Sequence, residues 1–380
     1  MVRKILSALA GAAVGIACTF FLLSPNAPAP LAQIFKPQKQ VVGFLPFGLL
    51  SKADKDYSEY ITTLAYFGLT IDQDGSILKM DNSQEEEPGW YTLASGKADQ
   101  IFNNMTRKGV NLSLVVFSGD DNIIYPLISD PIPHARTLVS EVAPIMKKYS
   151  FKDLNLDIES PKEASSEARV KFTQFAREIK TGLAQNHLGT LTVDVSPTIF
   201  VKKYLIDPQS IGSIADYVLI MAYDYHYPGS YVSGPVAPLY GAGAVSEFDT
   251  NVPVQEALTL IPKEKIILGV PLYGYEWETI TDFPRSATIP ASALTDSNRR
   301  AEQFLEGCAT CSAQTDNIAR EQYVIYKDKE TGTFHQMFFP NEQSMAAKVN
   351  FAKSMNLGGI GLWALGFEGN TILDPLKSYK

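Results

Sequence analysis

The sequence predicts an α/β fold, a (β/α)8 barrel of the TIM type with a small α+β insertion between its seventh and eighth strands. Short apolar runs rich in β-branched and aromatic residues alternate with longer amphipathic segments, which is typical of βαβ units. Residues 266–270 (IILGV) are apolar at consecutive positions, as in a parallel strand covered on both faces. An open, doubly wound sheet is the alternative, but residues 43–48 after the first strand lack the glycine spacing of a phosphate loop.

Eight strands and five clear helices follow from these patterns. The expected strands are residues 41–46, 63–71, 111–117, 153–159, 190–196, 217–223, 265–272 and 359–363. The expected helices are residues 94–108, 134–149, 164–184, 252–260 and 343–355. Residues 41–380 are therefore expected to form one barrel domain.

The connection between the last two strands is too long for a simple loop. Within it, residues 323–326 and 334–339 flank a charged turn at 327–332, which predicts a β-hairpin. We expect an inserted subdomain at about residues 276–340. Because it follows the carboxyl end of a strand, it should rise from the face of the barrel where active sites lie.

The first 40 residues have a different composition. Arg3 and Lys4 precede an uncharged apolar run of 19 residues, from Ile5 to Leu23, which as a helix would be about 28 Å long. Residues 1–23 are thus expected to be an N-terminal signal or membrane anchor; the length favours an anchor, and a cleaved signal stays open. Residues 24–40 are expected to be a Pro/Ala-rich linker. The barrel would then be extracytoplasmic, either membrane-anchored through this N-terminal segment alone or secreted.

Composition and charge exclude several classes of protein. The chain has 380 residues, 45% hydrophobic and 19% charged, which is typical of a globular protein and not of a disordered one. With 33 basic and 41 acidic residues the net charge is −8, so no nucleic-acid partner is expected. The oligomeric state is not indicated.

Two of the three cysteines, Cys308 and Cys311, form a C-x-x-C pair. In an exporting compartment a disulfide is the expected state of this pair. A zinc site would require a second pair of ligands at matching spacing, and the four histidines do not supply one. No metal is expected.

Residues 153–159 (DLNLDIE) carry the strongest chemical signal. Leucine and isoleucine alternate with Asn155, Asp157 and Glu159, so the polar side chains share one face of the strand. In a closed barrel that face points to the axis, where carboxylates are costly to bury unless they have a function or partners. Asp157 lies about 7 Å below Glu159, which ends the strand at the mouth. A protonated acid beside an ionised partner is what glycosidic bond cleavage requires.

This segment resembles the catalytic strand of glycoside hydrolase family 18, the chitinase family, whose pattern is D-G-x-D-x-D-x-E. Further motifs of the family follow in order. Residues 221–226 (MAYDYH) resemble its M-x-Y-D, residues 269–274 (GVPLYG) its G-x-P-x-Y-G, and residues 358–363 (GGIGLW) its G-G-x-x-x-W. Phe67 falls where the second strand of the family usually carries phenylalanine. The resemblance covers nearly all of residues 41–380.

The resemblance implies substrate-assisted, retaining catalysis without a cofactor. Glu159 would protonate the glycosidic oxygen while the 2-acetamido group of the substrate attacks the anomeric carbon. Asp157 would orient that acetamido group, and Tyr223 would donate a hydrogen bond to its carbonyl oxygen. The expected substrate-binding residues are Asp224, Trp363, Phe67, Tyr225, His226 and Tyr273.

Three positions depart from the family pattern. Lys152 and Asp153 replace its opening D-G, and Asn155 replaces its first Asp. We expect Asn155 to belong to the catalytic group without a charge, and Asp157 to keep a single role. Asp194 on the next strand is a candidate partner for Asn155 inside the barrel.

The expected function is hydrolysis of β-1,4 linkages at N-acetylglucosamine in chitin-type glycans or peptidoglycan. The partner would be a polysaccharide that contains N-acetylglucosamine. The alternative is a non-catalytic carbohydrate-binding protein, a lectin or inhibitor, on the same barrel. Such relatives typically lose the final Glu of the motif, and Glu159 is present.

Overall fold

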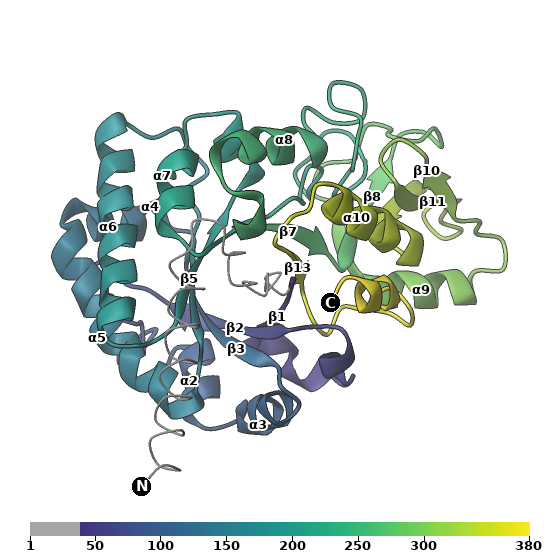
Figure 1. Ribbon diagram of the computed structural model, residues 1–380. Coiled ribbons are helices and arrows are strands. Elements are labelled where there is room, and N and C mark those ends of the chain that lie inside the picture. The colour runs from purple at the N-terminus through teal and green to yellow at the C-terminus, as the bar shows by residue number, and fades with distance from the viewer. Residues whose placement is uncertain (1–38) are drawn as a thin grey trace, which may run out of the picture. The chain divides into compact units, whose positions relative to one another are not determined.

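A closed barrel of eight parallel strands forms the centre of the computed structural model, which describes residues 39–380 (Figure 1). The order around the barrel is β1-β13-β7-β6-β5-β4-β3-β2. These strands are β1 (Gln40–Pro46), β2 (Thr63–Thr70), β3 (Asn111–Ser118), β4 (Asp153–Ile158), β5 (Thr190–Val195), β6 (Tyr217–Ile220), β7 (Ile266–Pro271) and β13 (Gly359–Trp363). All eight expected strands are confirmed, with ends that differ by up to three residues.

Helices surround the barrel on its outside (Figure 1). They are α2 (Pro88–Ala94), α3 (Asp99–Arg107), α4 (Asp121–Ser129), α5 (Pro131–Tyr149), α6 (Ser166–Gln185), α7 (Pro208–Ile214), α8 (Asn251–Leu260) and α10 (Glu342–Ser354). The helix expected at 94–108 is wrong at its start. α2 ends at Ala94 and α3 begins at Asp99, because Gly96 between them has a φ of 77°, which ends a right-handed helix.

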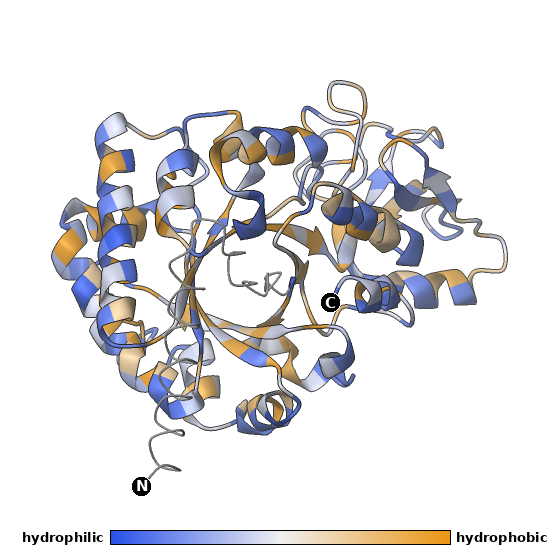
Figure 2. Cartoon of the chain, in the orientation of Figure 1, coloured by the Kyte–Doolittle hydropathy of each residue, from blue (hydrophilic) through white to orange (hydrophobic). Residues whose placement is uncertain are grey.

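Two apolar clusters hold the barrel together. One lies between the strands and the helices and includes Leu154, Leu156 and Ile158 of β4. The other lies inside the barrel and includes Val42, Ala65 and a few side chains from other strands. The barrel strands are accordingly mostly orange in Figure 2, whereas the helices alternate between orange and blue. The alternation in β4 thus separates apolar side chains outside from polar ones inside, as the sequence predicts.

The insertion is a second, five-stranded sheet in the order β10-β11-β12-β8-β9. It consists of β8 (Tyr273–Thr279), β9 (Leu294–Ser297), β10 (Gln314–Asp316), β11 (Glu321–Lys327) and β12 (Phe334–Phe339), with helix α9 (Asn298–Gly307). The expected hairpin is confirmed by the antiparallel pairing of β11 with β12. The sheet begins at Tyr273, three residues before the expected start, because β8 follows β7 almost directly. Figure 1 shows it beside the barrel.

A buried ion pair joins this insertion to helix α10. Lys348 Nζ lies 2.9 Å from Glu321 Oε1, and both side chains are almost completely buried. Glu321 also accepts a hydrogen bond from the backbone N–H of Ala237, in the loop between β6 and α8. One carboxylate therefore connects the insertion, a barrel helix and a loop that follows a barrel strand.

The expected signal or anchor at 1–23 lies outside the described residues, as does most of the expected linker at 24–40. The last linker residue, Gln40, begins strand β1, so that boundary was one residue late. No helix within residues 39–380 has both the length and the hydropathy needed to cross a membrane.

We predict that Lys348→Met lowers the free energy of unfolding by about 3 to 5 kcal/mol, because it leaves the Glu321 carboxylate buried without its cation. Urea unfolding monitored by circular dichroism measures this change. Lys377→Met is the matched control, because the side chains of its partners Asp374 and Glu59 are exposed and such surface pairs contribute about 0 to 1 kcal/mol. A loss for Lys348→Met no larger than that of the control contradicts the prediction. The double variant Lys348→Met/Glu321→Leu should recover part of the loss.

Candidate active site

Strand β4 places a column of polar side chains along the inside of the barrel. Asp153, Asn155 and Asp157 are all buried, with exposed fractions of 9%, 1% and 3%. Asp153 is the lowest of them and accepts hydrogen bonds from the hydroxyls of Ser113 and Thr192, at 2.6 and 3.0 Å. The column therefore starts in a hydrogen-bonded layer and ends toward the mouth at Glu159, directly after the strand.

Asp194 of β5 lies beside this column. Its Cα is the register partner of the Asp157 Cα, and Asn155 Nδ2 donates a hydrogen bond of 2.9 Å to Asp194 Oδ1. The expected contact between Asn155 and Asp194 is present. Asn155 Oδ1 and Asp157 Oδ1 are buried and have no hydrogen-bond partner among the described protein groups.

Burial dominates the electrostatics of the column. It raises the pKa of Asp153 to about 6, against the hydrogen bonds from Ser113, Thr190 and Thr192, which lower it. Burial also raises the pKa of Asp157 well above its ordinary value, and the negative charges of Asp194 and Glu159 raise it further. These acids keep a proton more readily than acids in water do.

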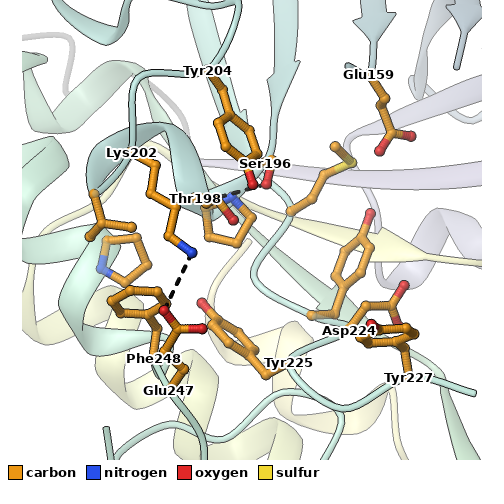
Figure 3. Close-up of a pocket in the computed structure, with 15 residues that line it drawn as sticks. Glu159, Ser196, Thr198, Lys202, Tyr204, Asp224, Tyr225, Tyr227, Glu247 and Phe248 are labelled. Atoms are coloured by element: carbon orange, nitrogen blue, oxygen red, sulfur yellow. Dashed lines mark hydrogen bonds and ion pairs between the residues drawn. The ribbon is translucent and has the colours of Figure 1, made fainter. Parts of the chain in front are cut away.

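Glu159 lies at the mouth of the barrel and lines a cleft of about 440 Å³ (Figure 3). Its carboxyl contacts solvent, but the cleft walls desolvate it enough to raise its pKa, and the negative charge of Asp224 adds to this shift. The other walls come from the segments that follow β5 and β6. Glu159 can therefore hold a proton beside anything that occupies the cleft.

Asp224 is held by two tyrosines of the insertion. The hydroxyls of Tyr273 and Tyr275 on β8 both donate hydrogen bonds to Asp224 Oδ1. Asp224 has a φ of 59°, in the left-handed region that aspartate enters more readily than most residues. Burial raises its pKa and the two tyrosine hydroxyls lower it. Tyr273 itself is buried, so it acts on the cleft through Asp224 and does not line it.

Aromatic rings meet at the carboxyl ends of the strands. Trp363 of β13 packs edge-on against Phe67 of β2, with 4.9 Å between ring centroids, and Phe44 lies 5.9 Å from the Trp363 ring. Trp363 and Phe67 are half-buried, so each keeps part of its ring surface accessible. Tyr223 packs against the cluster inside the barrel and against a further apolar cluster that includes Tyr273 and Tyr275, and it also lines the cleft. The structure thus brings these expected residues to one end of the barrel.

Tyr225 and His226 separate in the structure. Tyr225 lines the cleft, whereas His226 is buried and bonds through Nδ1 to the Pro235 carbonyl oxygen at 2.8 Å. A Cβ on Gly234 would lie only 2.4 Å from His226 Cε1, so the loop closes tightly over the ring. The placement of His226 as a substrate-binding side chain is therefore corrected: it stabilises the loop between β6 and α8.

Several residues of the cleft carry no motif signal in the sequence. Lys202 Nζ forms an ion pair of 3.3 Å with Glu247, on the side of the cleft away from Glu159 (Figure 3). Tyr204, Tyr227 and Phe248 also line the cleft. They lie in loops, where spacing gives no indication of which side chains face inward. Tyr275 could have been identified from the sequence, because it lies two residues after Tyr273 and a strand places both hydroxyls on one face.

Cys308 and Cys311 are joined by a disulfide directly after α9, in the insertion. Within residues 39–380, no cluster of three or more histidine, cysteine, aspartate or glutamate side chains is arranged to hold a metal ion.

Residues 39–368 match the sequence model of the family described as "Glycosyl hydrolases family 18". The chain belongs to this family. Its match covers the whole barrel and the insertion, and it includes β4, the tyrosine segment after β6 and Trp363 at the end of β13. The resemblance inferred from the motifs is thereby confirmed.

Among family 18 relatives, a putative sporulation-specific glycosylase of Bacillus subtilis is 28% identical, over 90% of this chain and 77% of its own length. A cortical fragment-lytic enzyme of the same organism is 27% identical, over 84% of this chain and 68% of its own. A Cycas revoluta chitinase solved in complex with (GlcNAc)4 has the same fold, with a TM-score of 0.74 at 21% identity, over 90% of this chain and 99% of its own.

We predict that the Asp153→Asn variant loses less stability than the wild type as the pH rises from about 4 to about 6. The folded protein raises the pKa of Asp153 from 3.8 to about 6, so it binds this proton more tightly than the unfolded chain does. The resulting stabilisation is present at low pH and is lost as the pH rises through about 6. Removing the group should flatten the curve of unfolding free energy by up to about 3 kcal/mol over this range.

Chemical unfolding of both proteins at a series of pH values measures this difference. Asp282→Asn, which removes an exposed carboxyl of the insertion, is the control and should keep the wild-type slope. An Asp153→Asn curve parallel to that of the wild type would contradict the assignment.

Proposed function

We propose that this chain is a hydrolase that cleaves β-1,4 linkages at N-acetylglucosamine in a glycan by substrate-assisted, retaining catalysis. The observation that carries the proposal is the pair of carboxyls along β4. Glu159 reaches the cleft with a raised pKa, and Asp157 lies below it, buried and with an oxygen that has no hydrogen-bond partner among the described residues. An acid that can donate a proton and a carboxyl group available to a substrate are therefore placed in one line.

The first step uses Glu159 as a general acid. Its proton goes to the glycosidic oxygen, the bond between that oxygen and the anomeric carbon breaks, and the carbonyl oxygen of the 2-acetamido group bonds to the anomeric carbon. The product is an oxazolinium ion. Water then attacks the anomeric carbon and gives a proton back to Glu159, so the configuration is retained.

Asp157 and Tyr223 act on the acetamido group in this scheme. Asp157 accepts the hydrogen bond of the acetamido N–H and stabilises the positive charge that develops on the ring. Tyr223 donates its hydroxyl to the acetamido carbonyl oxygen, and burial keeps that hydroxyl protonated by raising its pKa. Asp224 binds a sugar hydroxyl, held in place by Tyr273 and Tyr275. Trp363 offers a ring face to the C–H face of the sugar.

We propose a glycan of the bacterial cell wall as the physiological substrate, with chitin-type oligomers as the second candidate. The names of the Bacillus relatives, a sporulation-specific glycosylase and a cortical fragment-lytic enzyme, support the first. The chitinase crystallised with (GlcNAc)4 supports the shared N-acetylglucosamine unit. An extracytoplasmic location, with the N-terminal segment as anchor or signal, fits the same substrate.

We predict that Glu159→Gln lowers kcat on a fluorogenic chitobioside or on purified peptidoglycan by on the order of 10² to 10⁴-fold or more, because the general acid is lost. Binding of N-acetylglucosamine oligomers should survive, since the amide keeps the shape of the side chain. Activity assays together with calorimetric titration measure both effects. Glu163→Gln, an exposed position four residues later, is the control and should keep wild-type activity.

Retained hydrolysis by Glu159→Gln would contradict the mechanism. Binding of the oligomers by a wild-type protein that does not hydrolyse any of the glycans would instead identify a non-catalytic carbohydrate-binding protein.

A further inference from the structure

Asp157 has a second carboxyl group beside it, on the neighbouring strand. Asp157 and Asp194 are register partners on β4 and β5, so their Cα atoms are about one strand spacing, or 5 Å, apart. Val193 and Val195 belong to the cluster outside the barrel, so Asp194 between them points inside. Both aspartates are almost completely buried, with exposed fractions of 3% and 2%.

Among the described residues, the charged groups that act on this pair are negative, and no cation is one of them. Glu159 acts on both carboxyls, and Asp153 acts on Asp194 from the layer below. Tyr223 lies close to the pair and to Glu159, and its hydroxyl is neutral. Two ionised carboxylates on paired positions of neighbouring strands would repel each other strongly in a buried site. Such pairs typically keep one proton between them.

Asn155 fixes which oxygens of the pair are free. Its amide N–H donates to Asp194 Oδ1, which leaves Asp194 Oδ2 to carry or accept a proton. Asp157 Oδ1 has no partner among the described protein groups. The amide cannot itself titrate, so it orients Asp194 without competing for the proton.

We propose that Asp157 and Asp194 share a single proton, and that Asp194 is a positioning residue that keeps this proton when Asp157 binds the substrate as a carboxylate. The proton moves from an oxygen of Asp157 to an oxygen of Asp194, and the total charge of the pair does not change. This inference rests on the proposed function for the role of Asp157 toward the acetamido group. It replaces the expectation from the sequence that Asp157 keeps a single role.

The arrangement also explains how the site works with Asn155 where the family pattern has aspartate. The second carboxyl is not lost from the site. It lies on β5 at the position paired with Asp157, and the Asn155 amide holds it there. A site with Asn155 but without Asp194 would leave Asp157 with no neighbouring carboxyl to take its proton when the substrate binds.

Three variants test this inference: Asp194→Asn, the exchange Asn155→Asp/Asp194→Asn, and the control Asp153→Asn, which removes a buried carboxyl from the layer below. The aspartate carboxyl carbons are isotope-labelled, and NMR titration counts the carboxyls that stay protonated at neutral pH in the full chain without substrate. The pH profile of kcat and the separate values of kcat and KM are measured on a fluorogenic chitobioside.

The wild type should keep one proton on the pair at neutral pH, whereas in Asp194→Asn a proton that burial keeps on Asp157 has no neighbouring carboxyl to move to. Its kcat should fall on the order of 10-fold or more while KM changes little, and its pH profile should lose the ionisation of the pair. The exchange variant should regain both the shared proton and part of the activity. Asp153→Asn should keep the shared proton.

The proposal is contradicted if neither carboxyl of the wild-type pair stays protonated at neutral pH, or if Asp194→Asn keeps the wild-type kcat and pH profile. It is also contradicted if a folded exchange variant behaves like Asp194→Asn alone. Failure of the proposed function is a separate result, because the proton count is made without substrate: a protein that shares the proton but hydrolyses no N-acetylglucosamine glycan overturns the proposed function only.

Discussion

The chemistry of this protein depends on the burial of carboxyl groups inside a closed barrel. Asp153, Asp157 and Asp194 lie where water is largely excluded, so each must be protonated, hydrogen-bonded or paired. At the lower end, hydroxyls from the neighbouring strands satisfy Asp153. Higher up, the Asn155 amide donates a hydrogen bond to Asp194, and the described residues leave Asp157 Oδ1 without a donor. The same shortage of donors that makes these groups costly for stability makes them reactive toward a substrate.

The scaffold keeps this group in place from two sides. The apolar alternation of β4 anchors the strand in the outer cluster, which fixes the height of each polar side chain along the barrel axis. The insertion contributes from above, because β8 supplies Tyr273 and Tyr275 to Asp224. The ion pair of Lys348 and Glu321 ties that insertion to the barrel. A subdomain far from β4 in the sequence therefore shapes the mouth of the site.

Much of this could be predicted from the sequence, because period-two alternation and consecutive apolar runs report burial directly. They gave the eight strands, the inward face of β4 and the contact of Asn155 with Asp194. Loop residues such as Lys202 and Phe248 were missed, since their orientation depends on how distant loops pack. His226 was assigned to the substrate because it adjoins the Tyr223 motif. Its ring is buried instead, because the hydrogen bond to the Pro235 carbonyl and the close approach of Gly234 hold it under the loop.

In the proposed mechanism, the 2-acetamido group of the substrate is the nucleophile and Asp157 supports it. The most direct test compares hydrolysis of a fluorogenic chitobioside with that of the matching cellobioside, which has a hydroxyl in place of the acetamido group. We expect hydrolysis of the chitobioside with initial release of the β-anomer, as read by NMR, and no measurable turnover of the cellobioside. Comparable rates on the two substrates, or an inverted first product, would contradict it.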